Sequence, residues 1–162
     1  MTNRKSELYN YIQTYENYDS DYWTSGNGNN EILFILKKYT LNSWQNLKEE
    51  IENWNSDELE ILAGALSDEE SWIYTEDIRE ILAQRSSLFA YIFIKLDTVY
   101  AIDLLDRFEF IFKGNEKSNS ELSKVKAQFE NIKNHQSVKM FHSTERVSFL
   151  EKILDEHINA SR

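Results

Sequence analysis

The 162-residue chain has 28 acidic and 18 basic residues, 41% hydrophobic residues, no cysteine and no proline. Without cysteine it has no disulfide or thiolate chemistry, and a net charge of −10 argues against nucleic acid as a direct ligand, because phosphates need basic side chains. The longest apolar run, residues 88–94, is too short to span a bilayer. One soluble domain over residues 1–162, with a hydrophobic core of its own, is expected.

Apolar periodicity predicts helices from the beginning of the chain. The first covers residues 4–18 and the second residues 31–39. Between them, SGNGNN at residues 25–30 predicts a loop, because Asn-Gly tolerates positive φ. A third helix is expected to begin at the cap Ser43 and to bury apolar residues that recur at three-, seven- and ten-residue offsets: Trp44, Leu47, Ile51 and Trp54.

Three polar residues predict the start of the next helices. Asn55 is followed three residues later by Glu58, which is the spacing of a capping box. Ser67, followed by three acidic residues, predicts another helix start by the same logic, and Thr75 predicts a third.

The second half of the chain continues the helical pattern. Residues 87–96 are apolar on all sides, which is typical of a central buried helix. The next helix begins at Asp97 or Thr98 and ends at Gly114, and two more cover residues 120–134 and 144–159. The predicted fold is therefore all-α, a compact bundle or a short α-solenoid of about seven to eight antiparallel helices.

Negative charge is concentrated in one fifth of the chain. Residues 48–80 contain twelve acidic and two basic residues, so this segment alone carries −10 and the remainder is neutral. Crowded like charges destabilise a fold through self-repulsion, so a cluster of this size suggests a function that requires it.

A helical wheel separates two faces of residues 55–66. The buried face is expected to comprise Leu59, Leu62, Ala63 and Leu66. The opposite face contains Asp57, Glu60 and Gly64, with Ile61 beside them and Glu58 at the margin. A glycine inside a helix costs about 1 kcal/mol relative to alanine, and the close approach of another surface is one reason to keep it.

The sequence contains no pattern that indicates catalysis or metal binding. Of the three histidines, His135, His142 and His157, the first two lie seven residues apart with no carboxylate at metal-ligand spacing. The glycine-rich loop lacks the features of a phosphate-binding motif. The carboxylates are expected to be solvated, and a catalytic carboxylate needs burial or a tuned neighbour. No enzymatic activity, metal or cofactor is predicted.

A family resemblance adds to this interpretation. The stretch SWQNLKEEIENWNSDELEILAGAL, followed by SLFAYIFIKLD, resembles the small acidic helical immunity proteins of bacterial contact-dependent and polymorphic toxin systems. The similarity lies in size, acidity and tryptophan- and leucine-rich helices, and no functional residue is transferred by it. It implies a cytoplasmic protein that binds one cognate toxin domain, often a basic nuclease, and blocks it.

The predicted function is therefore an immunity protein that meets a basic toxin domain through an acidic helical face, with no nucleic acid or membrane as partner. The alternative is a helical scaffold or adaptor that binds a cellular protein. The beginning of the chain lacks the apolar segment of a secretory signal, which also favours the cytoplasm. The residues predicted to bind the partner are Asp57, Glu58, Glu60, Ile61, Gly64, Asp68, Glu69, Glu70, Trp72, Tyr74 and Asp77.

Overall fold

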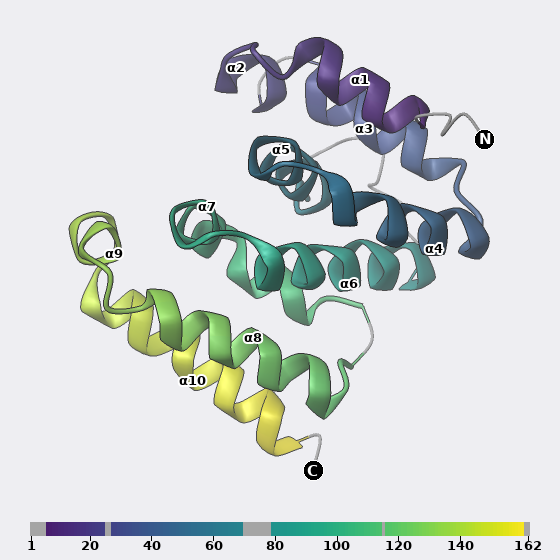
Figure 1. Ribbon diagram of the computed structural model, residues 1–162. Helices are drawn as coiled ribbons and strands as arrows, with labels where there is room; N and C mark the ends of the chain where they lie inside the picture. The colour runs from purple at the N-terminus through teal and green to yellow at the C-terminus, as the bar shows by residue number, and fades with distance from the viewer. Residues whose placement is uncertain (1–5, 25–26, 70–78, 115, 161–162) are drawn as a thin grey trace.

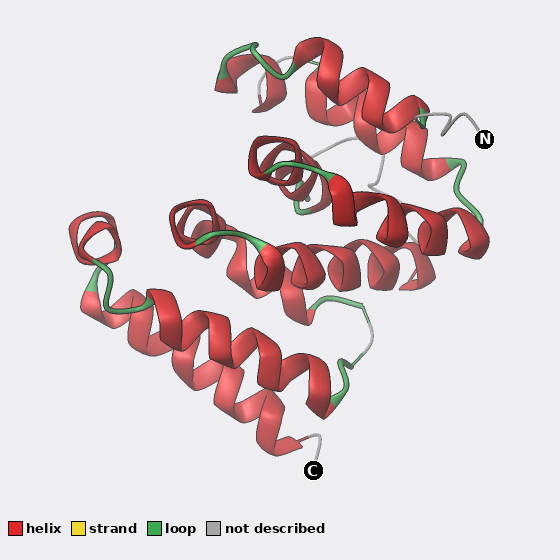
Figure 2. Ribbon diagram, in the orientation of Figure 1, coloured by secondary structure: helices red, strands yellow, loops and turns green. Residues whose placement is uncertain are grey.

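Most of the described chain folds into helices, as its apolar periodicity predicts and its lack of proline permits. The computed structural model describes residues 6–24, 27–69, 79–114 and 116–160. Within these ranges it contains ten α-helices, two 3₁₀ segments and no strand. Figure 2 shows helices joined by short loops throughout the described chain. The all-α prediction is confirmed. The expected helix count of seven to eight is too low, because short helices such as those at residues 20–24 and 136–141 carry little periodic signal.

The helices follow one another as labelled in Figure 1. The first half contains α1 (Glu7–Tyr15), α2 (Ser20–Thr24), α3 (Gly28–Lys37), α4 (Leu41–Glu50), η1 (Ile51–Asn53) and α5 (Ser56–Leu66). The second half contains α6 (Arg79–Lys95), α7 (Thr98–Asp103), η3 (Leu104–Phe112), α8 (Asn119–Ile132), α9 (Gln136–Phe141) and α10 (Thr144–Ala160).

Helices that pack against one another are close in the sequence, mostly one or two elements apart. Helix α3 packs against α1 and α5, α5 against α6, α6 against η3 and α8, and α8 against α10. Figure 1 shows the resulting stack, with the two termini at opposite ends. This order is typical of a short α-solenoid, in which each helical pair buries its apolar face against the next.

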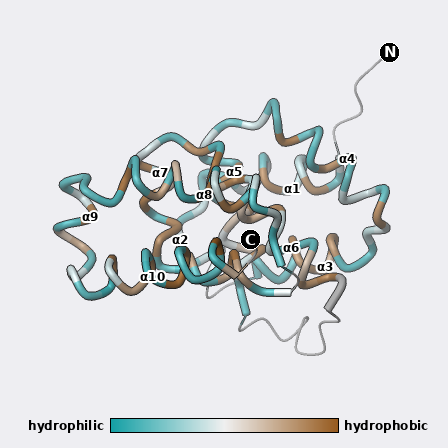
Figure 3. Tube along the Cα trace, turned by 90° about the horizontal axis from the view of Figure 1, so that it is seen from below, coloured by the Kyte–Doolittle hydropathy of each residue, from teal (hydrophilic) through white to brown (hydrophobic). Residues whose placement is uncertain are grey.

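The core lies between these layers and is continuous from α1 to α10. Figure 3 shows hydrophobic and hydrophilic residues interspersed along the helices, the pattern of helices that bury one face. The centre of α6 is the exception, since Leu88, Phe89, Ala90, Ile92 and Phe93 are all buried, as predicted for a central helix. None of the helices within the described ranges is both long and apolar enough to cross a membrane.

Helix capping follows the sequence at some positions and departs from it at others. The capping box of α5 is confirmed: the Asn55 backbone N–H donates to Glu58 Oε1 and the Glu58 N–H donates to Asn55 Oδ1, both at 2.9 Å. Helix α4 begins earlier than predicted, because Thr40 is its cap and Ser43 is the reciprocal partner. Ser67 does not begin a helix; it ends α5, and its hydroxyl donates to the Ala63 carbonyl at 2.9 Å.

Two glycines are required by close packing. The predicted loop at residues 25–30 is shorter than expected, since α3 begins at Gly28, where a Cβ would lie 2.5 Å from Trp23 Cε3. Gly114 has φ +82°, as expected of a glycine that ends a helix, and a Cβ there would lie 2.6 Å from Ala83 Cα. The helix predicted before it is divided at Arg107 by a non-helical backbone conformation.

Candidate functional site

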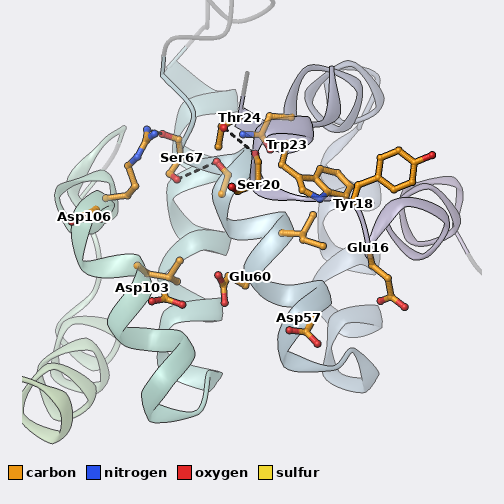
Figure 4. Close-up of a pocket in the computed structure, with 15 residues that line it drawn as sticks. Glu16, Tyr18, Ser20, Trp23, Thr24, Asp57, Glu60, Ser67, Asp103 and Asp106 are labelled. Carbon is orange, nitrogen blue, oxygen red and sulfur yellow. Dashed lines mark hydrogen bonds between the residues drawn. The ribbon is translucent and has the colours of Figure 1, made fainter. Parts of the chain in front are cut away.

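The outer face of α5 forms one wall of a surface pocket of about 370 Å³. Four residues predicted to bind a partner line it together: Asp57, Glu60, Ile61 and Gly64. Their i, i+3, i+4 and i+7 spacing places them on one stripe, because Leu59, Leu62, Ala63 and Leu66 hold the other side of α5 in the core. This part of the predicted site is therefore assembled in the structure, as Figure 4 shows for its labelled members.

Glu58 does not belong to this surface. Glu58 is only 2% exposed, and its carboxylate accepts a hydrogen bond from the Asn55 backbone N–H in the capping box. The prediction that it lies at the margin of the partner-binding face is wrong. The capping-box spacing already indicated the reason, because a glutamate at that position turns back toward the cap.

The opposite walls of the pocket bring in three carboxylates from distant parts of the sequence. Asp103 ends α7, Asp106 lies in η3, and Glu16 follows the last residue of α1. Figure 4 shows Asp103 and Glu60 facing each other from neighbouring helices, with Glu16 on the other side. Sequence reasoning missed all three, since they lie outside the acidic segment and no local pattern links them to α5.

Burial and neighbouring charge change the protonation of this pair. Burial is the main cause that raises the pKa of Glu60 to about 7, and the charges of Asp103 and Asp57 add to it. The pKa of Asp103 is also raised, chiefly by burial. The neighbouring Asp103 contributes to the raised pKa of Glu60, so Glu60 is partly protonated near neutral pH. The expectation that every acid of this face is simply solvated is wrong for Glu60.

Three of the pocket carboxylates have no ion-pair partner among the described residues, whereas Asp106 Oδ1 lies 3.8 Å from His142 Nδ1. Within the described residues, Asp57, Glu60 and Asp103 form no ion pair, and Asp57 instead accepts a hydrogen bond of 2.9 Å from the Tyr100 hydroxyl. Arg107 is the single base among the described lining residues. Its Nη1 donates to the Ser67 carbonyl at 3.2 Å.

The acids outside the pocket behave differently. Glu69 is exposed and pairs with Lys113 at 3.6 Å, and Glu52 pairs with Lys95. Asp68 is partly buried and accepts a hydrogen bond of 3.3 Å from the Asn29 amide. Part of the acidic segment is therefore neutralised by lysines of the second half of the chain, while the α5 stripe is not. The predicted contact residues Glu70, Trp72, Tyr74 and Asp77 lie outside the described residues.

Two buried polar residues complete the pocket wall. Trp23 and Asn29 are 7% and 6% exposed, and within the described part of the chain Trp23 Nε1 and Asn29 Oδ1 have no hydrogen-bond partner. Native proteins rarely leave such atoms unpaired, because each costs about 1–3 kcal/mol. Sequence reasoning missed them, since a tryptophan and an asparagine beside a predicted loop carry no sign of burial.

The assembled groups can bind a cation and can take up or release a proton near neutral pH. In the described residues, no group of three or more histidine, aspartate or glutamate side chains is arranged to hold a metal ion. Neither a protein-family model, nor a curated protein, nor a solved structure matches this chain.

Proposed function

We propose that this protein is a non-enzymatic immunity protein, which binds and neutralises a cognate bacterial toxin domain through the acidic pocket. The observation that carries the proposal is a set of carboxylates around a cavity of about 370 Å³, Asp57 and Glu60 from α5 and Asp103 from α7, which form no ion pair with any described residue. The resemblance to immunity proteins in size, acidity and helical character supports a toxin as the partner.

A basic protein surface would supply the missing positive charge. Burying a carboxylate without a partner is costly, so a cluster left unpaired in the free protein gains most from a cation brought by another chain. Toxins that cut nucleic acid need positive charge around their active sites, and an acidic inhibitor can cover that surface. Complementary charge also accelerates encounter, up to about 10⁸–10⁹ M⁻¹s⁻¹ at low salt.

The first test is co-expression with the product of the neighbouring gene. We expect the two proteins to co-purify, and we expect the double variant Asp57→Lys/Asp103→Lys to lose at least about 2 kcal/mol of binding free energy. Both side chains are exposed, so helical circular dichroism should be retained. The matched control is Glu49→Lys/Glu116→Lys, which makes the same charge change at exposed sites outside the pocket and should bind nearly normally.

If the pocket variant and the control variant bind the toxin with equal affinity, the pocket is not part of the interface.

The stack of helical pairs in chain order also favours the alternative function, a helical adaptor for a cellular protein, because stacks of this kind present extended binding surfaces. A neighbouring gene that encodes a long secreted protein with a variable C-terminal domain supports immunity. An operon without such a gene supports the adaptor.

A further inference from the structure

The pocket contains unsatisfied groups of opposite hydrogen-bonding character. Among the described residues, the indole N–H of Trp23 is a donor without an acceptor, and Asn29 Oδ1 is an acceptor without a donor. The carboxylates of Asp57, Glu60 and Asp103 line the same pocket and can accept further hydrogen bonds, including Asp57, which already accepts one from Tyr100. An occupant must therefore provide several donors with positive charge and, beside them, at least one acceptor.

The fold holds the two buried groups in place. The benzo ring of Trp23 packs on the backbone at Gly28, and Tyr11 and Tyr22 contact the indole edge to face, with ring centroids 6.1 and 5.1 Å away. The ring nitrogen lies on the other side of the indole, on the edge that faces the carboxylates in Figure 4. Asn29 is fixed because its Nδ2 donates to Asp68, which leaves Oδ1 for an occupant.

We propose that this pocket receives one arginine side chain of the partner protein, with its guanidinium among Asp57, Glu60 and Asp103 and a backbone carbonyl of the same segment accepting from Trp23 Nε1. The inference rests on the proposed function, since it specifies the chemistry of the partner at the same pocket. Guanidinium has five N–H donors in a planar array, which suits carboxylates that come from two helices.

Other cations fit these groups less well. A lysine ammonium is a compact charge with three donors, and a metal ion needs ligands that converge on one point. A free small cation would leave the Trp23 indole N–H without an acceptor, whereas a peptide supplies carbonyls on both sides of the arginine. The cavity of about 370 Å³ lies at the small end of ligand pockets, which run from about 300 to 1,000 Å³, and suits one side chain.

The test uses Nα-acetyl-arginine N-methylamide, a single arginine between two peptide bonds, titrated into the ¹⁵N-labelled full chain. The indole N–H resonance of Trp23, assigned with Trp23→Phe, should shift in a saturable manner at millimolar probe. The same derivative of citrulline, which is nearly isosteric but uncharged, should leave the resonance unmoved. The lysine derivative should bind about tenfold more weakly than the arginine derivative.

A substitution in the pocket tests whether the shift of the Trp23 resonance reports binding there. Asp103→Asn should weaken binding of the arginine derivative about tenfold, whereas Glu49→Gln outside the pocket should not. An unmoved Trp23 resonance, or an equal shift with citrulline, overturns the inference even if the neighbouring gene product still co-purifies. A specific arginine shift without co-purification supports the arginine site and contradicts the toxin partner, so the two failures are distinct.

Discussion

Glu60 is the residue whose protonation the tertiary structure changes most. It is half-buried, and the charged or titratable groups around it come from every neighbouring element: Asp57 on α5, Tyr100 and Asp103 on α7, Asp106 and Arg107 on η3, and Glu16 after α1. Because Glu60 is partly buried and acids outnumber bases around it, its ionised form is less stable in the folded protein than in the unfolded chain, where its pKa is the ordinary 4.5.

The sign of the resulting pH dependence follows directly. The pKa of Glu60 in the folded protein, about 7, lies above its value in the unfolded chain. Ionisation of Glu60 therefore does not destabilise the fold below about pH 4.5; it destabilises the fold increasingly as the pH rises and fully above about pH 7. Glu60→Gln should therefore raise the free energy of unfolding at pH 8 by about 1 kcal/mol, a figure reduced for solvent screening of a half-exposed group. Urea denaturation at pH 8 and pH 4.5 measures the difference.

The control is Glu49→Gln, an exposed glutamate on α4 outside the pocket. It should change the free energy of unfolding by a similar small amount at both pH values. An effect of Glu60→Gln that is equal at pH 8 and pH 4.5 would contradict the raised pKa of Glu60.

Helix α5 shows which features of a helix can be predicted from residues close together in the sequence. Its capping box and its buried face were predicted correctly, because both depend on residues three or four positions apart. Gly64 lies in the interior of this helix, and a Cβ added there would meet nothing within 4 Å. No packing within the described chain requires this glycine, and it lines the pocket.

Gly64→Ala is therefore expected to stabilise the fold by about 0.5–1 kcal/mol, because alanine is the better helix former. The same methyl group projects toward the pocket and should weaken partner binding. Thermal denaturation and affinity measurements on the same variant test both effects, and a variant that is more stable and binds normally would show that Gly64 is not kept for the interface.

Gly114→Ala is the contrasting substitution. Its φ of +82° and the 2.6 Å approach to Ala83 Cα leave no room for a side chain, so it should destabilise the fold by more than about 1 kcal/mol. A thermal melt that matches the wild-type protein would contradict this packing.

At the scale of the whole molecule, the net charge of −10 and the acidic pocket should govern association kinetics. Raising the salt concentration from about 0.05 to 0.5 M should slow association with a basic partner about tenfold or more and change dissociation less, because screening acts on long-range attraction. Stopped-flow fluorescence measures both rates. A salt-independent association rate would argue against electrostatic steering.

The sequence by itself determined that the protein is all-α, where most long helices lie and which stripe of α5 faces outward, because helical periodicity and caps are properties of nearby residues. It also located the acidic segment, but not which acids remain unpaired. Only the tertiary structure decided that α5 meets Asp103, Asp106 and Glu16, that Glu69 meets Lys113, and that Trp23 and Asn29 close the pocket. These contacts join segments about 30 or more residues apart, and they arise from how whole helices stack, which no local spacing specifies.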